Sequence, residues 1–469
     1  MTLEAPMDQG SCPRPPAPLP RERPLNPLEL LHGLWTNPLA TYTRRAFEEP
    51  VVLSKSLLGE LAVVSDPTAI RQVMVDHAAN YRKDELQRRV LQASDEGGNG
   101  LLTAEGDDWR QQRRALAALF TPRAVAEFLP AMRQSARWIL DRWAPLRPGR
   151  RVDVAAEMSQ LTLDVLTRTI FPSGLGRDPV DFARAMADYF DAIGRVHPLD
   201  VLGAPKWIPR VGRPQIRRSQ GFFEAAVEDL VSSRRAWLAT HEGAAETTGL
   251  DLLTRLLTAR DPQTGAGLGE AEIRANVLTF IGAGHETTAN ALTWSLYLLA
   301  LDPDWRAQVE AEVDDLPSAA EAASLEPFVK VRATLEEALR LYPPAASLSR
   351  AAIRPDVVAG KRIAAGTVVI VAPYVVHRHQ RLWDHPDRFD PRRFMPGRRE
   401  TIDRFAYLPF GAGPRVCIGM GFAMQEAVLL LATILRHYRL DLMPGHRVEP
   451  VQRITLRPRG GMPMLIQRR

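Results

Sequence analysis

One ten-residue stretch near the end of the chain, FGAGPRVCIG from Phe410 to Gly419, constrains the fold more than any other. It holds Cys417, one of only two cysteines in 469 residues. The glycines and the proline around this cysteine predict a tight turn whose backbone approaches another group closely. The proline-free apolar run from Met420 to Tyr438 predicts a helix, so Cys417 lies just before a helix N-terminus. Free N–H groups and the helix dipole at that point favour a thiolate.

A thiolate in such a turn is a natural axial ligand for haem iron, and Arg415 is suited to pair with a haem propionate. The spacing Phe410-x-x-Gly413-x-Arg415-x-Cys417-x-Gly419 resembles the haem-binding loop of the cytochrome P450 monooxygenases. A buried structural cysteine beside a loop is the alternative interpretation of Cys417 alone. The matching residues at the other four positions favour the haem site, with Cys417 as the metal ligand.

The longest helical pattern runs from Glu270 to Leu301, which at about 1.5 Å per residue gives roughly 48 Å. Inside it, Gly282 and Gly284 each cost about 1 kcal/mol relative to alanine. With the Thr287 hydroxyl they predict a groove for a small ligand, and Glu286 adds an acid that can relay protons. The segment resembles the oxygen-binding motif of the same family. The alternative is a core helix whose threonine bonds a backbone carbonyl.

Two further positions are predicted to hold haem. Trp109 and Arg113 are four residues apart in a predicted helix and share a face, so an indole N–H and a guanidinium could both reach a propionate. The pair resembles the family's Trp-x-x-x-Arg motif; an ordinary surface pair is the alternative. Arg350, His377 and Tyr374 are weaker propionate candidates.

A Glu-x-x-Arg pair, Glu337 and Arg340, lies in the helix predicted from Phe328 to Leu341. Taken alone, such a pair is usually a weak surface ion pair. The resemblance implies a buried structural pair closed by an arginine from a Pro-x-Arg-Phe stretch. We assign that stretch to residues 386–389, so Arg388 is expected to complete a network that steadies the cysteine loop.

The resemblance implies a mainly α fold with a small β-rich subdomain. Haem b is expected between the long central helix and the cysteine loop, in one domain over residues 28–469. Residues 1–27 contain eight prolines and no apolar run, which predicts a disordered or polyproline-like tail in which Cys12 is incidental. Elsewhere the pattern predicts hairpins over 51–64 and over 448–465, the latter turning at Gly460-Gly461. It also predicts helices over 122–143, 154–171 and 179–193.

Two irregular segments are expected to cover a ligand pocket. Residues 81–103 end in a glycine-rich stretch and are a candidate mobile loop. Residues 195–213 form an apolar, proline-bearing connector, which is interpreted as a lid or a shallow membrane contact. A loop packed on its own domain is the alternative for this connector.

Charge and cysteine content limit the partners and the compartment. The net charge of +5 is spread along the chain, which does not indicate nucleic acid. Two cysteines indicate a reducing compartment. The sequence shows no signal peptide or transmembrane segment, so we expect a soluble, cytoplasmic protein of the bacterial kind. The resemblance implies electrons from NAD(P)H through a ferredoxin or flavodoxin with its reductase, and a basic docking face was assigned to Arg110, Arg114, Arg392, Arg393 and Arg415.

The predicted function is a haem-thiolate monooxygenase that inserts one atom of O2 into an apolar small molecule. Gly284 makes room for dioxygen, and Thr287 with Glu286 organises water that supplies protons. Thr288 is rotated about 100° from Thr287 and is expected to face away. The alternatives are a haem-thiolate peroxygenase, isomerase or oxidative-coupling enzyme, and a haem protein that senses or stores a ligand. The substrate itself is left open.

Overall fold

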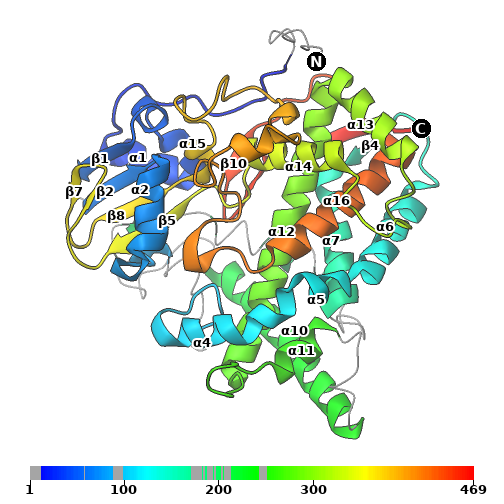
Figure 1. The fold of residues 1–469 in the computed structure, drawn as a ribbon, viewed down its shortest axis with the longest axis horizontal. Coiled ribbons are helices and arrows are strands. Elements are labelled where there is room, and N and C mark those ends of the chain that lie inside the picture. Colours follow the sequence, from blue (N-terminus) through cyan, green and yellow to red (C-terminus); the bar gives the residue numbers. More distant parts are fainter. Residues whose placement is uncertain are drawn as a thin grey trace.

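The computed structural model describes the chain except residues 1–11, 57–58, 88–98, 171–181, 183–184, 187, 189–193, 195–196, 202–203, 205–212 and 242–250. Figure 1 shows a helical part built around α12 (Glu270–Leu301), with β1, β2, β5 and β8 gathered at its side. The predicted bounds of α12 are confirmed. The predicted helix over 179–193 lies mostly outside the described residues, as does most of the connector 195–213, of which α9 (Pro198–Val201) is described.

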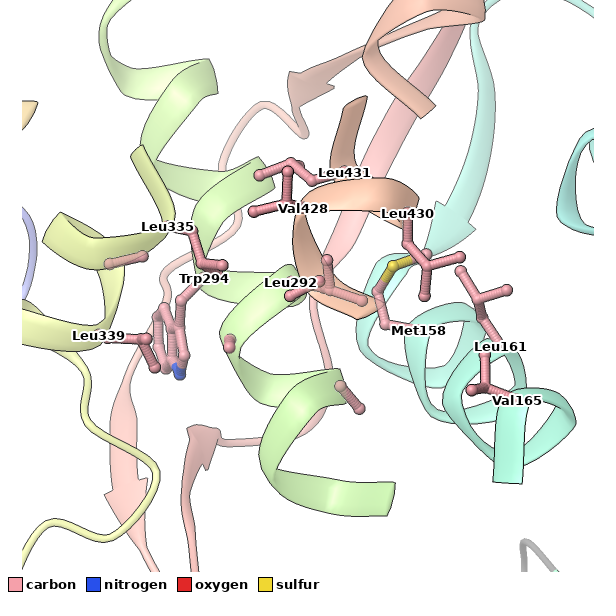
Figure 2. Packing of buried hydrophobic residues seen from close by; sticks show 14 of the residues in the cluster. Met158, Leu161, Val165, Leu292, Trp294, Leu335, Leu339, Val428, Leu430 and Leu431 are labelled. Atoms are coloured by element: carbon pink, nitrogen blue, oxygen red, sulfur yellow. The ribbon is translucent and has the colours of Figure 1, made fainter. Parts of the chain in front are cut away.

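The helical core surrounds α12, which is apolar on nearly every side and is therefore buried along most of its length. It packs against α7 (Val154–Ile170), α14 (Val329–Leu341) and α16 (Met420–His437). Figure 2 shows Trp294 beside Leu335 and Leu339 of α14, with leucines of α16 on the other side of α12. Because α16 follows the cysteine loop directly, this core fixes the loop relative to α12.

The predicted helix over 122–143 is divided at Phe128, because Pro130 lacks an N–H and suits only the first turn of a new helix. The other α-helices that the structure describes are α1 (Pro27–Thr36), α2 (Pro67–Arg71), α4 (Gly106–Ala117), α5 (Pro122–Ala126), α6 (Leu129–Trp143), α10 (Arg213–Thr240), α11 (Leu252–Thr258), α13 (Pro303–Asp315) and α15 (Pro373–Val376). Of these helices, α2 packs in the hydrophobic core of the β-rich side, where α1 and α15 also lie (Figure 1).

A five-stranded sheet forms the β-rich side, in the order β1-β2-β8-β5-β3. The hairpin predicted over 51–64 is confirmed, since Val51 of β1 pairs with Val64 of β2. A second core lies on this sheet and includes Val64, Ile70 and Val369. The strands are β1 (Val51–Ser56), β2 (Gly59–Val64), β3 (Tyr81–Arg82), β5 (Leu348–Ala352) and β8 (Val368–Val371).

The predicted hairpin at Gly460-Gly461 is wrong. β10 (Pro450–Gln452) pairs with β11 (Leu456–Pro458), whereas β12 (Pro463–Arg468) pairs with β4 (Arg150–Asp153) and β9 (Tyr438–Leu442). The two glycines instead carry the chain from one sheet to another. A Cβ on Gly461 would lie 2.3 Å from the Asp153 carboxylate, and its φ is +91°, so this crossing requires glycine. A further pair, β6 (Asp356–Val358) and β7 (Lys361–Ile363), is antiparallel.

Of the two alternatives for the tail over residues 1–27, disorder is wrong for residues 12–27, which the structure describes as a segment held by hydrogen bonds. The Pro13 carbonyl accepts from the Phe389 N–H at 2.9 Å, and the Pro16 carbonyl accepts from the Tyr342 hydroxyl at 2.7 Å. Prolines cannot donate, but their carbonyls can still anchor an extended segment. Residues 1–11 lie outside the described residues.

Within the described part of the chain, no single helix is both long and apolar enough to span a membrane. One pair, 106–120 with 122–143, meets those two requirements only when taken together, and it is bent by 50°.

Candidate active site

A mostly apolar cavity of about 610 Å³ lies between α12 and the cysteine loop. The loop contributes Phe410 and Cys417 to its wall, and α12 contributes Gly284 and Thr287. Residues widely separated in the sequence therefore meet here, as the motif analysis predicted. Gly413 and Gly419 belong to the same loop, and Gly419 lines the cavity.

The cysteine loop is held in one shape by its glycines. Gly411 and Gly413 have φ of +73° and +71°. A Cβ on Gly413 would lie 1.9 Å from the Met74 carbonyl oxygen, so no other residue fits without moving that backbone. Met74 belongs to a π-helical turn over Gln72–Asp76. The predicted close approach of backbone to the loop is thus made by the turn that follows α2.

Burial against the surrounding protein raises the pKa of the Cys417 thiol, although the side chain itself is exposed toward the cavity that it lines. The Gly419 N–H and the charge of Arg113 act in the opposite direction. The stabilisation of a thiolate by N–H groups at the helix terminus, predicted from the sequence, is therefore present, but burial of the thiol outweighs it. A bound metal cation deprotonates a coordinating thiol outright, so the thiolate form belongs to the metal-bound state.

Cationic side chains gather at the end of the cavity near the cysteine loop. Lys83, Arg113, Arg350 and Arg415 all line it, together with Trp109. A carboxylate-bearing group placed here would be surrounded by charged donors. The residues therefore fit haem b, whose two propionates need such donors and whose iron needs one thiolate. No group of three or more metal-binding side chains occurs among the described residues.

Arg415 is positioned by three neighbours. Its guanidinium lies 4.3 Å from the centre of the Trp109 ring. Its Nη2 lies 2.9 Å from the Glu105 carboxylate and donates to the Ala104 carbonyl at 3.0 Å. Cation–π contact and ion pairing together orient the fork that was predicted to bind a propionate.

Lys83 is a site residue that the sequence analysis missed. It is almost fully buried, donates to the Leu102 carbonyl, and has its pKa lowered to about 7, first by burial and then by the charge of Arg415. An anion bound beside it would favour its charged form. A lysine in an irregular segment carries no pattern that predicts its position.

Two of the weaker propionate candidates are wrong. His377 and Tyr374 are buried away from the cavity. His377 pairs through Nδ1 with the Arg340 carbonyl at 3.1 Å, and its Nε2 accepts from the Leu408 N–H at 2.7 Å. His377 is thus a structural bridge that ends two residues before Phe410. Arg350, the third candidate, does line the cavity.

The groove in α12 contains the predicted residues, but their side chains face different neighbours. Thr287 lines the cavity and donates its hydroxyl to the Ala283 carbonyl at 2.6 Å, so the alternative backbone bond is present. A Cβ on Gly284 would lie 3.2 Å from Leu166 of α7, so this glycine also permits close helix packing. Thr288 lines the cavity as well, and the expectation that it faces away is wrong.

Glu286 does not belong to the cavity wall. Its Oε1 lies 3.5 Å from Nη1 of Arg457 on β11. His285 is buried against Ser159, and burial lowers its pKa to about 4. The acid and the hydroxyl of the motif therefore point to different sides of α12, as a rotation of about 100° per residue requires.

The pair Glu337–Arg340 is fully buried, with contacts of 2.6 and 2.7 Å. The assignment of Arg388 as the closing cation is wrong. Its carbonyl accepts from Arg340 at 2.8 Å, whereas the guanidinium near Glu337 is that of Arg393, at 3.8 Å. Arg393 belongs to a second Pro-x-Arg-Phe stretch, residues 391–394, and that stretch closes the network.

The basic face assigned to five arginines is not a single surface. Arg415 points into the cavity, Arg393 is mostly buried beside Glu337, and Arg114 binds the buried Asp261 through two bonds of 2.8 and 2.6 Å. Arg110 is exposed and pairs with Asp107. Most of these charges are therefore already committed to contacts within the chain.

A cysteine loop facing a glycine-bearing helix across a cation-rimmed cavity defines a haem-thiolate protein. The sequence model described as Cytochrome P450 matches residues 15–463. The chain belongs to the cytochrome P450 family and is a haem b monooxygenase. The resemblance stated from the motifs, the mainly α fold and the haem cofactor are confirmed.

Named relatives and a solved structure agree. The chain is 33% identical over 419 residues to cyclooctat-9-en-7-ol 5-monooxygenase of Streptomyces melanosporofaciens, covering 88% of this chain and 87% of the relative. It is 31% identical over 397 residues to pentalenene oxygenase of Streptomyces avermitilis, covering 83% and 84%. The crystal structure of cytochrome P450DA heme domain matches with a TM-score of 0.79 at 28% identity, over 97% of this chain and 99% of that one.

Proposed function

We propose that the protein inserts one oxygen atom of O2 into a neutral cyclic alkene or alkenol. The observation that carries this proposal is the apolar cavity in which Cys417 and Thr287 line facing walls. When bound, a haem with an axial thiolate supplies the oxidising chemistry and favours O–O cleavage. The protein binds, orients and excludes water around that centre.

Each site residue has a distinct role in this proposal. Cys417 is the axial ligand, with Gly413 and Gly419 shaping its loop beside Phe410. Lys83, Trp109, Arg113, Arg350 and Arg415 hold the propionates. Thr287 keeps a hydroxyl at the cavity wall for a bonded water, Gly284 leaves space in the groove, and Glu286 supplies protons.

The polarity of the cavity supports a neutral substrate. Its described cations lie at the end near the cysteine loop, where the propionates bind. On α10, by contrast, the described lining side chains are Gln220, Phe223 and Glu224, and Glu224 disfavours a carboxylate. The names of the two Streptomyces relatives give cyclic alkenes or alkenols. A fatty acid is the competing substrate class.

Titration of the holoprotein with pentalenene and with lauric acid tests this choice. Binding that displaces water from the iron shifts the Soret band. We expect pentalenene to give a saturable shift and an oxygenated product with NADPH and a redox partner. Tight binding and oxygenation of lauric acid, with none for pentalenene, would exclude the proposed substrate class.

The electron donor is proposed to be a ferredoxin or flavodoxin with its reductase, acting in the cytoplasm. One relative, of Bacillus cereus, is named as a bifunctional cytochrome P450/NADPH–P450 reductase and is 30% identical over 377 residues, which are 34% of its length. NADPH oxidation measured with each donor separately distinguishes them. Product formation from hydrogen peroxide alone, with no turnover through either donor, would favour a peroxygenase.

A further inference from the structure

Three polar contacts join one face of α12 to the end of the β10–β11 turn and the start of β11. The side chains on α12 are spaced by four residues and therefore share a face. The contacts are Glu286 Oε1 to Arg457 Nη1 at 3.5 Å, the Asn290 amide to Thr455 Oγ1 at 3.0 Å, and the Trp294 indole N–H to the Leu456 carbonyl at 3.3 Å. A displacement of the turn is thus transmitted to the face of α12 that carries Glu286.

The same turn belongs to the cavity wall. Ile454 and Thr455 both line the cavity, so Thr455 contacts the ligand space and α12 at once. The base of the turn is braced by the Asn37 amide, which donates to the Pro450 carbonyl at 2.9 Å. Within the turn, the Arg453 guanidinium also donates to the Thr36 carbonyl at 2.9 Å, which leaves Ile454 and Thr455 as the part that a ligand meets.

Arg457 attracts the Glu286 carboxylate toward β11. The two side chains are mostly buried, at 23% and 13% exposed, so their attraction is screened less than that of a surface pair. Thr287, the next residue, lines the cavity, whereas Glu286 does not. For Glu286 to serve the groove, its contact with Arg457 must lengthen.

We propose that Arg457 is a positioning residue that holds Glu286 away from the cavity, and that a substrate lying against Ile454 and Thr455 weakens this hold. The proposal rests on the proposed function, in which Glu286 supplies protons beside Thr287. Weakening of the ion pair makes Glu286 available for proton delivery when substrate fills the cavity. Dioxygen reduction is thereby favoured with substrate present rather than absent.

Azole binding to the holoenzyme tests this coupling without any turnover. If ligand binding weakens the ion pair, then removing the pair must tighten ligand binding by the same factor. Clotrimazole binds the iron and is bulky enough to reach the turn, whereas imidazole is not. We expect Arg457→Gln and Glu286→Gln each to lower the Kd of clotrimazole at least about fivefold, and the double variant to lower it no further.

Matched controls separate coupling from general damage. Arg457→Lys keeps the charge and should restore the wild-type Kd. Arg459→Gln breaks an exposed ion pair with Glu449, 2.8 Å long and just past the end of β11, and should leave both Kd values unchanged. Imidazole affinity should stay the same in every variant. An unchanged clotrimazole Kd in Arg457→Gln, or an equal change for imidazole, would overturn the proposal.

The failure of the proposed function would be seen in a different measurement. Product formed per NADPH in Glu286→Gln reports on the proton supply, and the azole Kd reports on the ion pair. Normal product per NADPH in Glu286→Gln removes Glu286 from proton delivery and with it the purpose of the hold. A lower azole Kd together with poor coupling in Glu286→Gln supports both proposals.

Discussion

Two Glu–Arg pairs, one made by α14 and one between α12 and β11, differ in contact length and in burial. Glu337–Arg340 is fully buried, and Arg340 also donates to the carbonyls of His377, Pro386 and Arg388 at 2.7 to 2.8 Å. Glu286–Arg457 is a longer contact of 3.5 Å between side chains that are mostly but not fully buried. The same two residue types therefore make a fixed support in one place and a contact that can be broken in the other.

The difference follows from what surrounds each pair. The Glu337 carboxylate also accepts from the Asp390 N–H at 2.8 Å, so its charge is matched by a cation and by backbone donors. His377 extends this network to Leu408, next to the cysteine loop. Rigidity is needed where a single thiolate must hold an iron, whereas a proton donor must be able to move.

The largest expected effect separates the two pairs directly. Arg340→Ala leaves the Glu337 charge buried, which costs about 3–5 kcal/mol, so we expect little soluble holoprotein; Glu337→Ala should behave alike. Arg457→Ala should retain haem and melt within a few degrees of wild type. Haem content and thermal melting measure both. Equal damage from Arg340→Ala and Arg457→Ala would mean that the pairs do not differ as described.

The next effect concerns which arginine closes the first network. Arg393→Ala removes the second cation near Glu337 and should destabilise the holoprotein by about 1–3 kcal/mol. Arg388→Ala keeps the carbonyl that Arg340 uses and should cost less. Urea unfolding of both variants measures the difference. A larger loss in Arg388→Ala would restore the assignment made from the sequence.

The wrong assignment of Arg388 shows what a sequence motif alone does not determine. The chain contains Pro-x-Arg-Phe twice, at 386–389 and 391–394, and spacing alone does not say which guanidinium approaches Glu337. Lys83 was missed because a lysine in an irregular segment has no periodicity. The Gly460-Gly461 hairpin was wrong because strand pairing with β4 and β9 is long-range and leaves no local pattern.

The correct predictions concern features that a local sequence pattern determines. The bounds of α12 followed from one uninterrupted apolar pattern, and the cysteine loop from residues whose geometry is local. Gly413 is required by one carbonyl, that of Met74, and this steric demand is visible in the motif. The contact of Glu286 with Arg457, by contrast, joins residues 171 positions apart and was not predicted, because the sequence analysis placed Glu286 in the groove with Thr287.

A smaller effect is expected from acid, and two buried histidines, His377 and His285, produce it. Burial lowers the pKa of His377 to about 3 and that of His285 to about 4. Both values lie below the ordinary value near 6.5, so the unfolded chain binds protons first as pH falls. Stability is therefore full above about pH 6.5 and declines toward pH 4 by at most about 1.4 kcal/mol per pH unit for each histidine.

Urea unfolding between pH 7 and pH 5 measures this slope. His377→Asn and His285→Asn should each reduce the slope, whatever they do to stability at pH 7. An unchanged slope in both core variants would mean that other groups dominate the acid sensitivity.

The smallest effect on stability, and a clear one on function, is expected at Thr287. Loss of its hydroxyl should leave haem and ligand binding intact while NADPH oxidation continues, product per NADPH falls and hydrogen peroxide rises.

Thr288 lines the cavity and is unsuitable as a control. Thr293 is the matched control, because its hydroxyl donates to the Ala289 carbonyl at 2.7 Å, as Thr287 does to Ala283 at 2.6 Å, yet it lies off the cavity wall. Thr293→Ala should stay coupled, and Thr287→Ser should recover much of the loss. Equal coupling in Thr287→Ala and Thr293→Ala would show that the hydroxyl at the wall is only a backbone contact, which would leave Glu286 as the proton source on that side.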